Sequence, residues 1–189
     1  MATLETNLVQ PSTGTTLTLG ASGDTVTIPS GATITNSGTA SGFGLFTSYA
    51  IIADQKAQNT DGGTFTSGAW REHDLQTEIA DPDSIVSISA NQFTLAAGTY
   101  FISWATGVYD TGATQTRIYN VTDTSEVGIG LGSFEVGTPF TGSCRTTIAG
   151  TKAFSLEGQC TDTRATTGWG TAANFGTEQY CYIEIFKEA

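Results

Sequence analysis

Few side chains of this sequence could do acid–base or nucleophilic chemistry: it has one histidine, three cysteines and 18 acidic residues. A Ser-His-Asp triad could use only His73, which stands in the run 71–74 on an expected strand, where neighbouring side chains point to opposite faces. We interpret His73 as a hydrogen-bonded or solvated histidine rather than a catalytic base. The G-x-S-x-G turn of α/β-hydrolases is also missing from the sequence. We therefore expect no catalytic residues and a protein that is not an enzyme.

Two patterns suggest a cofactor or a metal. Residues 168–173 match the dinucleotide-binding pattern G-x-G-x-x-A, but that motif needs a strand before it and a helix after it, and the chain offers neither. Glu78, Asp81 and Asp83 surround Pro82 and could hold Ca²⁺. An Asp-Pro turn, in which the aspartate binds its own backbone, is the interpretation that we favour, with calcium left open. We expect neither a cofactor nor a metal.

The three cysteines are Cys144, Cys160 and Cys181. An odd number cannot form a closed disulfide framework. Each alternates in phase with apolar residues along an expected strand, so we predict that all three are reduced thiols packed in the core. A zinc site would need close-spaced pairs of ligands, which the spacing of the cysteines does not provide.

Composition defines the class of protein. The formal net charge of −11 disfavours contact with nucleic acid phosphates and with anionic membranes. Only 13% of the residues are charged and 23 are glycine, which argues against a helical bundle and for an all-β protein. The first residues have neither the basic nor the apolar region of a secretory signal, so we expect synthesis in a cytoplasm.

From residue 46 onward, short alternating runs are separated by Gly, Asp, Asn and Ser. They predict about ten strands and hence a sandwich, jelly roll or barrel. The expected strands are 49–53, 72–79, 85–89, 92–95, 100–105, 116–121, 126–131, 144–148, 153–157 and 179–186.

The final expected strand is apolar on both faces, whereas an exposed antiparallel strand should be polar on its outer face. A second apolar face indicates a subunit interface. A loop folded over the sheet is the alternative. The candidate interface residues are Tyr180, Tyr182 and Phe186, opposite Cys181, Ile183 and Ile185.

Residues 1–44 differ from the remainder, because they contain only two charged side chains and three alternating runs at 15–19, 25–28 and 32–35. Such a segment has too little apolar surface to fold alone, so we expect it to become ordered against a partner surface. We assign it as an N-terminal anchor or short shaft and residues 45–189 as a head domain. The candidate anchor residues are Leu17, Leu19, Val26, Ile28 and Ile34.

Three aromatic residues lie in expected loops: Tyr109, Phe140 and Trp169. Such side chains can stack on sugars or on a protein partner, which makes them candidate partner contacts. Packing into the open end of the sandwich is the interpretation that we favour.

The run 91–104 begins Asn91-Gln92-Phe93 and continues to Gly98-Thr99-Tyr100, and it resembles the globular heads of the complement-component and tumour-necrosis-factor superfamily. Together with 49–54, 116–123 and 182–185, it also looks like the C-terminal heads of head-fibre and tail-fibre proteins from marine and cyanobacterial bacteriophages. The resemblance implies a ten-stranded jelly roll that assembles as a homotrimer.

These observations predict a non-enzymatic phage virion protein at the particle surface. In this interpretation, the N-terminal segment anchors a trimeric head to the capsid, as a decoration protein or head fibre, and the partners are other capsid or tail proteins. One alternative is a tail-fibre tip that binds a host-surface receptor, either a glycan or a protein. The other is a carbohydrate-binding or glycan-cleaving module, for which two carboxylates would supply the chemistry. The short N-terminal segment favours decoration.

Overall fold

The computed structural model describes residues 13–33, 35, 45–134 and 139–189. The chain divides into two compact units, Met1–Ala40 and Ser41–Ala189. Over the described residues, the regular secondary structure consists of strands, and no helix has the length and apolarity needed to cross a membrane.

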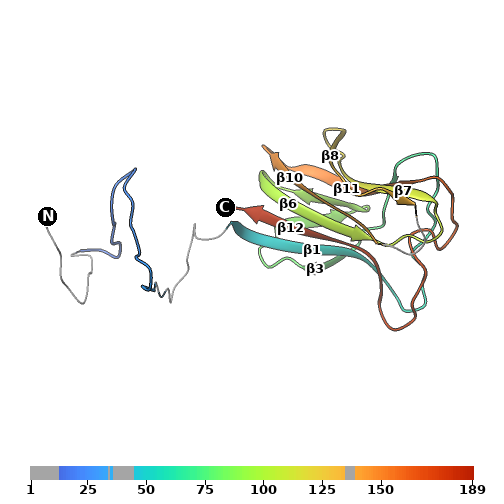
Figure 1. The fold of residues 1–189 in the computed structure, drawn as a ribbon, viewed down its shortest axis with the longest axis horizontal. Coiled ribbons are helices and arrows are strands. Elements are labelled where there is room, and N and C mark those ends of the chain that lie inside the picture. Colours follow the sequence, from blue (N-terminus) through green and yellow to red (C-terminus); the bar gives the residue numbers. More distant parts are fainter. Residues whose placement is uncertain (1–12, 34, 36–44, 135–138) are drawn as a thin grey trace. The chain divides into compact units, whose positions relative to one another are not determined.

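The strands of the head form two antiparallel sheets that face each other (Figure 1). The first sheet has the order β10-β6-β12-β1-β3. Its strands are β10 (Phe140–Ile148), β6 (Gly98–Thr106), β12 (Glu178–Glu188), β1 (Phe46–Lys56) and β3 (Thr77–Ala80).

The second sheet has the order β4-β5-β11-β7-β8, with β2 paired to β11 and β9 paired to β7. Its strands are β4 (Val86–Ser89), β5 (Gln92–Leu95), β11 (Lys152–Cys160), β7 (Ala113–Asn120), β8 (Ser125–Ile129), β2 (Arg71–Glu72) and β9 (Ser133–Phe134). The chain crosses repeatedly between the sheets, as in a jelly roll: β5 is in the second sheet, β6 in the first, β7 in the second, β10 in the first and β11 in the second. The predicted all-β jelly roll is confirmed, with twelve strands in place of ten because the expected strand 72–79 is divided and the two-residue strand β9 is additional.

The inward side chains of both sheets form one hydrophobic core, as the period of two requires. Trp104 is buried in this core, and its indole N–H donates a hydrogen bond to Thr116 Oγ1 (3.0 Å), which links the two sheets. A second cluster contains Phe65 stacked on Trp169, with ring centroids 3.8 Å apart, together with Phe140. The sandwich is therefore packed both between its sheets and under its loops.

The expected strand 72–79 is wrong as a single strand. Its first part is β2, which pairs with β11 in the second sheet, and its last part is β3, which pairs with β1 in the first sheet. The chain crosses between the sheets at residues 73–76, where the His73 and Leu75 side chains are buried between them. Alternate burial continues through this crossing, which is why the pattern looked like one strand.

The predicted turn at Asp81 is confirmed, and a second turn is closed in a similar way. The Asp81 carboxylate accepts the backbone N–H groups of Ile85 and Val86, each at 2.9 Å, and so binds its own turn. The turn after β7 is closed by Asn120, whose side chain donates to the Asp123 carboxylate and accepts the Asp123 backbone N–H. Both sites use short polar side chains to satisfy backbone and neighbouring groups.

The cysteines follow the predicted phases. Cys160 and Cys181 are buried and Cys144 is half-buried, and all three carry free thiols. Cys144 and Cys181 lie against the main core, and Cys160 belongs to the second cluster. Reduction of all three in the native protein stays a prediction.

The predicted ordering of the N-terminal unit against a partner surface stays a prediction. The alternating runs at 15–19 and 25–28 form no strand in the described residues, and the apolar side chains of Leu17, Leu19, Val26 and Ile28 are exposed. A strand needs a partner for its N–H and C=O groups, and these runs have none within the described part of the chain. Turns separate the runs, with hydrogen bonds from Asp24 N to Ala21 O and from Ala32 N to Pro29 O. The candidate anchor residue Ile34 lies outside the described residues.

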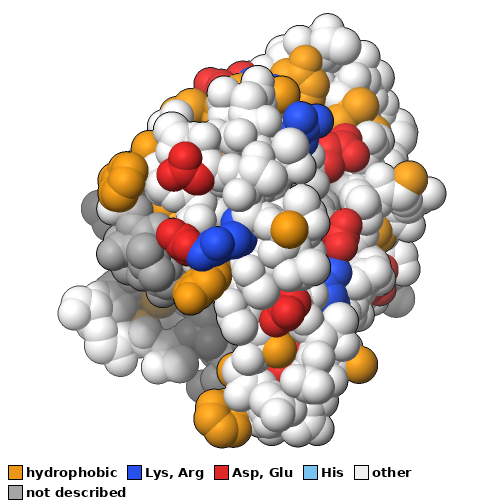
Figure 2. Space-filling view, turned by 90° about the vertical axis from the view of Figure 1, so that its right-hand side faces the viewer, with side chains coloured by type: hydrophobic (Ala, Val, Ile, Leu, Met, Phe, Trp, Pro, Cys, Tyr) orange, Lys and Arg blue, Asp and Glu red, His pale blue; other side chains and the backbone are white. Residues whose placement is uncertain are grey.

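The head has two distinct ends. At the entry end, Phe46 pairs with Glu188, and the backbone N–H of Ala189 donates to the Leu45 carbonyl (3.1 Å). At the loop end, β6 finishes at Thr106, and the chain returns through residues 107–112 to β7 (Figure 1). Figure 2 views the loop end, where hydrophobic side chains stand singly among charged and polar ones.

Candidate functional site

The outer face of the first sheet carries a cluster of aromatic side chains, which we call the aromatic face. Phe46, Tyr49 and Tyr182 are 39%, 44% and 38% exposed, and Phe101 and Phe186 are half-buried. Such large apolar groups are normally covered in a soluble protein when they lie together. The aromatic face is therefore the strongest candidate for a contact surface.

The strand register brings four of these side chains together, whereas Tyr182 lies further along β12, where it is paired with Ala53 and Ala105. Tyr49 is paired with Phe186, and Phe186 is paired with Phe101, so three strands contribute to one row. The Phe46 ring lies 5.1 Å from that of Phe186 and 6.5 Å from that of Phe101, between centroids. The residues that alternate with this row, such as Ile102, are fully buried in the core.

Polar groups lie within and beside the aromatic face. Glu184 stands on the same face, where Ser103 Oγ donates to one of its carboxylate oxygens at 2.7 Å. At the edge, the Arg145 guanidinium donates two hydrogen bonds to the Glu188 carboxylate, both at 2.7 Å. An apolar patch with hydrogen-bonded polar groups around it has the make-up of a protein–protein interface.

Tyr180 occupies the same face of β12 but is buried by its own chain. Its hydroxyl donates to the Thr60 carbonyl at 2.6 Å, and burial, together with nearby carboxylates, raises the pKa of Tyr180 to about 12. The Glu178 carboxylate accepts the backbone N–H groups of Ala173 and Asn174, which ties a second loop to the same place and lowers the pKa of Glu178. Tyr180 is thus covered by a loop of its own chain, as in the alternative to a subunit interface. The first residue of β12 that belongs to the aromatic face is Tyr182.

Sequence reasoning placed Tyr182 and Phe186 in the candidate interface and missed Phe46 and Tyr49. The alternation in β1 held a usable signal, because Tyr49 lies out of phase with Ala50 and Ile52, which are fully buried. The expected strand 49–53 is shorter than β1 and leaves Phe46 outside it.

The three aromatic residues expected in loops have different environments, and Phe140 is in fact the first residue of β10. Phe140 and Trp169 are buried in the cluster under the loops, and neither is available as a surface contact. Tyr109 is 40% exposed, with the Arg164 guanidinium 5.7 Å from its ring centroid. Phe140 and Trp169 therefore pack inside the head, and Tyr109 is the one of the three that stays a candidate partner contact.

A buried polar cluster surrounds the single histidine. His73 Nδ1 lies 2.9 Å from the Asp74 carbonyl oxygen and 3.8 Å from an Asp54 oxygen. Lys56 Nζ contacts the carboxylates of Asp54 (3.2 Å) and Asp74 (2.7 Å), and Gln76 donates to Asp54. Burial lowers the pKa of His73 to about 4 and raises the pKa of Asp54. His73 is therefore neutral at neutral pH.

This cluster offers little to a substrate or a metal. The His73 side chain is fully buried against the Trp169 ring, with centroids 4.2 Å apart, so it cannot meet a substrate in this conformation. Among the described residues, no group of three or more His, Cys, Asp or Glu side chains is arranged to hold a metal ion. Asp83, from the acidic cluster near Pro82, instead accepts a hydrogen bond from Ser48 Oγ.

Comparison with known proteins gives similarities in solved structures alone, since no family model and no curated protein matches the chain. The globular domain of the zebrafish complement 1qA protein is similar with a TM-score of 0.48 and 11% identity, over 74% of this chain and 95% of that chain. Murine APRIL, in crystal structures at pH 8.0 and pH 8.5, is similar with a TM-score of 0.49 and 7% identity, over 74% of this chain and 98% of that chain. The jelly-roll assignment rests on the strand order described above.

Proposed function

We propose that this protein is a non-enzymatic surface protein of a phage particle, in which three heads associate through their aromatic faces and residues 1–44 attach them to the capsid. The observation that carries the proposal is the aromatic face itself. Its five aromatic side chains come from three central strands of one sheet, and at least three of them are substantially exposed in the single chain. Burial of apolar area stabilises an assembly by roughly 25 cal/mol per Å².

The place where the chain enters the head would let the three N-terminal segments leave the assembly in one direction. The aromatic face includes Phe46, at the start of β1, so the head begins beside the proposed interface. In a closed ring of identical subunits, all copies are related by rotation about one axis. Three N-terminal segments would then leave the assembly from the same end and reach the same surface of the particle.

The N-terminal unit supports the role of anchor. Leu17, Leu19, Val26 and Ile28 are exposed, and a segment with so few charges gains stability only by covering such side chains. The choice of a threefold assembly and of a phage particle rests on the resemblance of 91–104 and its companion segments to fibre heads.

Sedimentation velocity of the full chain tests the assembly. We expect a particle of three times the 19.7 kDa chain mass. Tyr182→Lys places a charge in the aromatic face and should give monomers, because an unpaired charge in a desolvated interface is costly. Tyr109→Lys is the matched control, since Tyr109 has nearly the same exposure but lies at the loop end. A folded monomer for the unaltered protein would refute the proposal.

Deletion of residues 1–40 tests the anchor. The shortened protein should remain soluble and trimeric but should no longer join particles when both forms are supplied to particles that lack the protein. Occupancy is measured by quantitative mass spectrometry of purified particles. Normal occupancy of the shortened form would mean that the head itself is the docking element.

The alternative of a receptor-binding fibre tip is favoured by one observation, a lined pocket on the second sheet. That pocket is independent of the aromatic face.

A further inference from the structure

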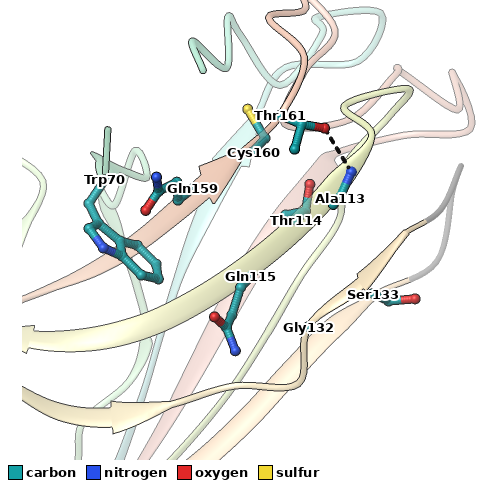
Figure 3. A pocket seen from close by; sticks show the side chains of 9 residues that line it. All are labelled: Trp70, Ala113, Thr114, Gln115, Gly132, Ser133, Gln159, Cys160 and Thr161. Carbon is teal, nitrogen blue, oxygen red and sulfur yellow. Dashed lines mark hydrogen bonds between the residues drawn. The ribbon is translucent and has the colours of Figure 1, made fainter. Parts of the chain in front are cut away.

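The outer face of the second sheet has a hollow of about 500 Å³ near the loop end (Figure 3). This volume lies within the roughly 300–1,000 Å³ of small-molecule sites. Its floor is formed by the beginning of β7 and the end of β11, and its sides by Trp70 and by Gly132 and Ser133. The hollow is built mainly from strands, so its shape is held by the sheet.

Register places the main side chains in line. Gln159 on β11 is paired with Gln115 on β7, and the pair next to them is Gly158 with Arg71 of β2. Trp70 directly precedes Arg71, so the indole stands beside Gln159 on the outer face. Figure 3 shows Trp70, Gln159 and Gln115 around the same hollow.

The Trp70 ring is held in place before any ligand arrives. The Arg117 guanidinium lies 4.1 Å from the ring centroid, and Arg117 is itself fixed by the Glu157 carboxylate at 2.7 Å. A fixed indole that lines a pocket offers an apolar surface on which the C–H face of a sugar ring can pack. Because the Arg117 charge is balanced by Glu157, it adds no attraction for an anion.

The amide side chains offer unused hydrogen-bonding capacity. Gln115 Nε2 donates to the Gly130 carbonyl at 3.3 Å, which leaves its amide oxygen for a ligand. The exposed Gln159 amide makes no hydrogen bond within the described part of the chain. Each amide has both a donor and an acceptor, so it can pair with sugar hydroxyls, which also donate and accept.

The charge of the lining selects the class of ligand. All nine lining residues are uncharged, and the protein has a net charge of −11. Phosphate, nucleotides and sialic acid would find no cation to balance them, and a cationic ligand would find no carboxylate. We propose that this hollow binds one neutral pyranose residue, packed on Trp70 and hydrogen-bonded by Gln115 and Gln159.

The site lies at the opposite end of the head from Phe46, where the chain enters. A head anchored at its entry end would therefore present the hollow outward, toward a glycan on another surface. The proposal depends on the proposed function only for this biological source of the sugar, and the binding itself is independent of assembly.

Nuclear magnetic resonance titration of the full chain tests the site with methyl β-glucopyranoside, methyl β-galactopyranoside and methyl α-mannopyranoside at up to tens of millimolar. At least one should shift the indole N–H signal of Trp70 and the side-chain amide signals of Gln115 and Gln159. Trp104 and Trp169 are buried and serve as internal references. The methyl glycoside should bind at least as well as the free sugar if the site takes a sugar joined to a glycan.

Variants locate the binding. Trp70→Ala and Gln159→Ala should each weaken the titration by at least about tenfold, which is about 1.4 kcal/mol. Gln58→Ala is the matched control, because Gln58 is also exposed but lies outside the hollow. Sialic acid and inorganic phosphate should leave the three signals unchanged.

Three results would overturn the proposal: no shift with any of the three glycosides, equal binding by the variants and the control, or comparable binding of sialic acid or phosphate. Capture of a host envelope protein that persists after periodate treatment of its sugars, without glycoside binding, would also overturn it in favour of a protein ligand. Sedimentation of the same samples reports assembly separately, so failure of the sugar site and failure of the trimer are distinguishable.

Discussion

Acidification should destabilise the head through its buried histidine. His73 is fully buried, and its burial lowers the pKa to about 4 from 6.5. Between these two pH values, the unfolded chain binds a proton that the folded chain does not. The stabilising contribution of the neutral His73 is therefore complete above about pH 6.5 and is lost progressively as the pH falls toward about 4.

The magnitude follows from the pKa difference. Each unit of difference between the folded and unfolded chain corresponds to about 1.4 kcal/mol, so the loss for His73 approaches about 3 kcal/mol at about pH 4. Asp54 acts in the opposite direction, because burial raises its pKa and proton uptake then favours the folded chain as the pH falls through that value. A comparison of variants is needed to separate the two groups.

The assay is urea unfolding at a series of pH values from about 7.5 to about 4.5, at one protein concentration so that assembly contributes equally. The comparison variant is His73→Asn, whose amide can still donate to the Asp74 carbonyl that His73 Nδ1 contacts. The free energy of unfolding of the unaltered protein should fall more steeply with acid than that of the variant. Parallel curves for the two proteins would refute the assignment of His73 as a buried neutral group.

Three further predictions concern packing, turns and thiols. Gly142→Ala should cost about 1–3 kcal/mol in thermal or urea unfolding, because a Cβ there would lie 2.1 Å from the Trp104 ring, whereas Gly150→Ala, with open space around it, should be neutral. Asp81→Ala removes the acceptor for two backbone N–H groups and should lower the free energy of unfolding by about 1–3 kcal/mol, measured in the same way. All three cysteines should be free thiols that resist alkylation until the protein is unfolded; for Cys181, burial raises the pKa to about 12. A mass measurement that finds a disulfide would contradict the free-thiol state.

Alternation predicted the strands wherever a run stays in one sheet. The expected strand 92–95 coincides with β5, because its alternating residues are bounded by turn residues and packed on one side. The run 72–79 could not be divided from the sequence, because His73 and Leu75 keep the alternating phase while the chain passes between sheets. The alternating pattern therefore indicates which side chains are buried and does not indicate which strands pair.

The candidate site was predicted only in part for a similar reason. Alternation places Tyr180 and Tyr182 on one face of β12, but it cannot show that the segment ending at Thr60 covers the first of them. The pocket was invisible to the sequence analysis because Trp70, Gln115 and Gln159 become neighbours only through the pairing of β11 with β2 and β7. In both cases the contacts join residues that are far apart in the sequence, which alternation along one strand does not show.

The position of β12 has a consequence for how the head forms during synthesis. This strand comes after all the others in the head, yet it lies between β6 and β1, so the first sheet has a gap at its centre until residues 178–188 have left the ribosome. Pairs such as Phe46 with Glu188 close loops that span almost the whole head, which makes folding slow. Until β12 is inserted, β1 and β6 both present unpaired edges. Folding of the first sheet therefore waits for residues 178–188, and the aromatic face forms only when β12 is in place.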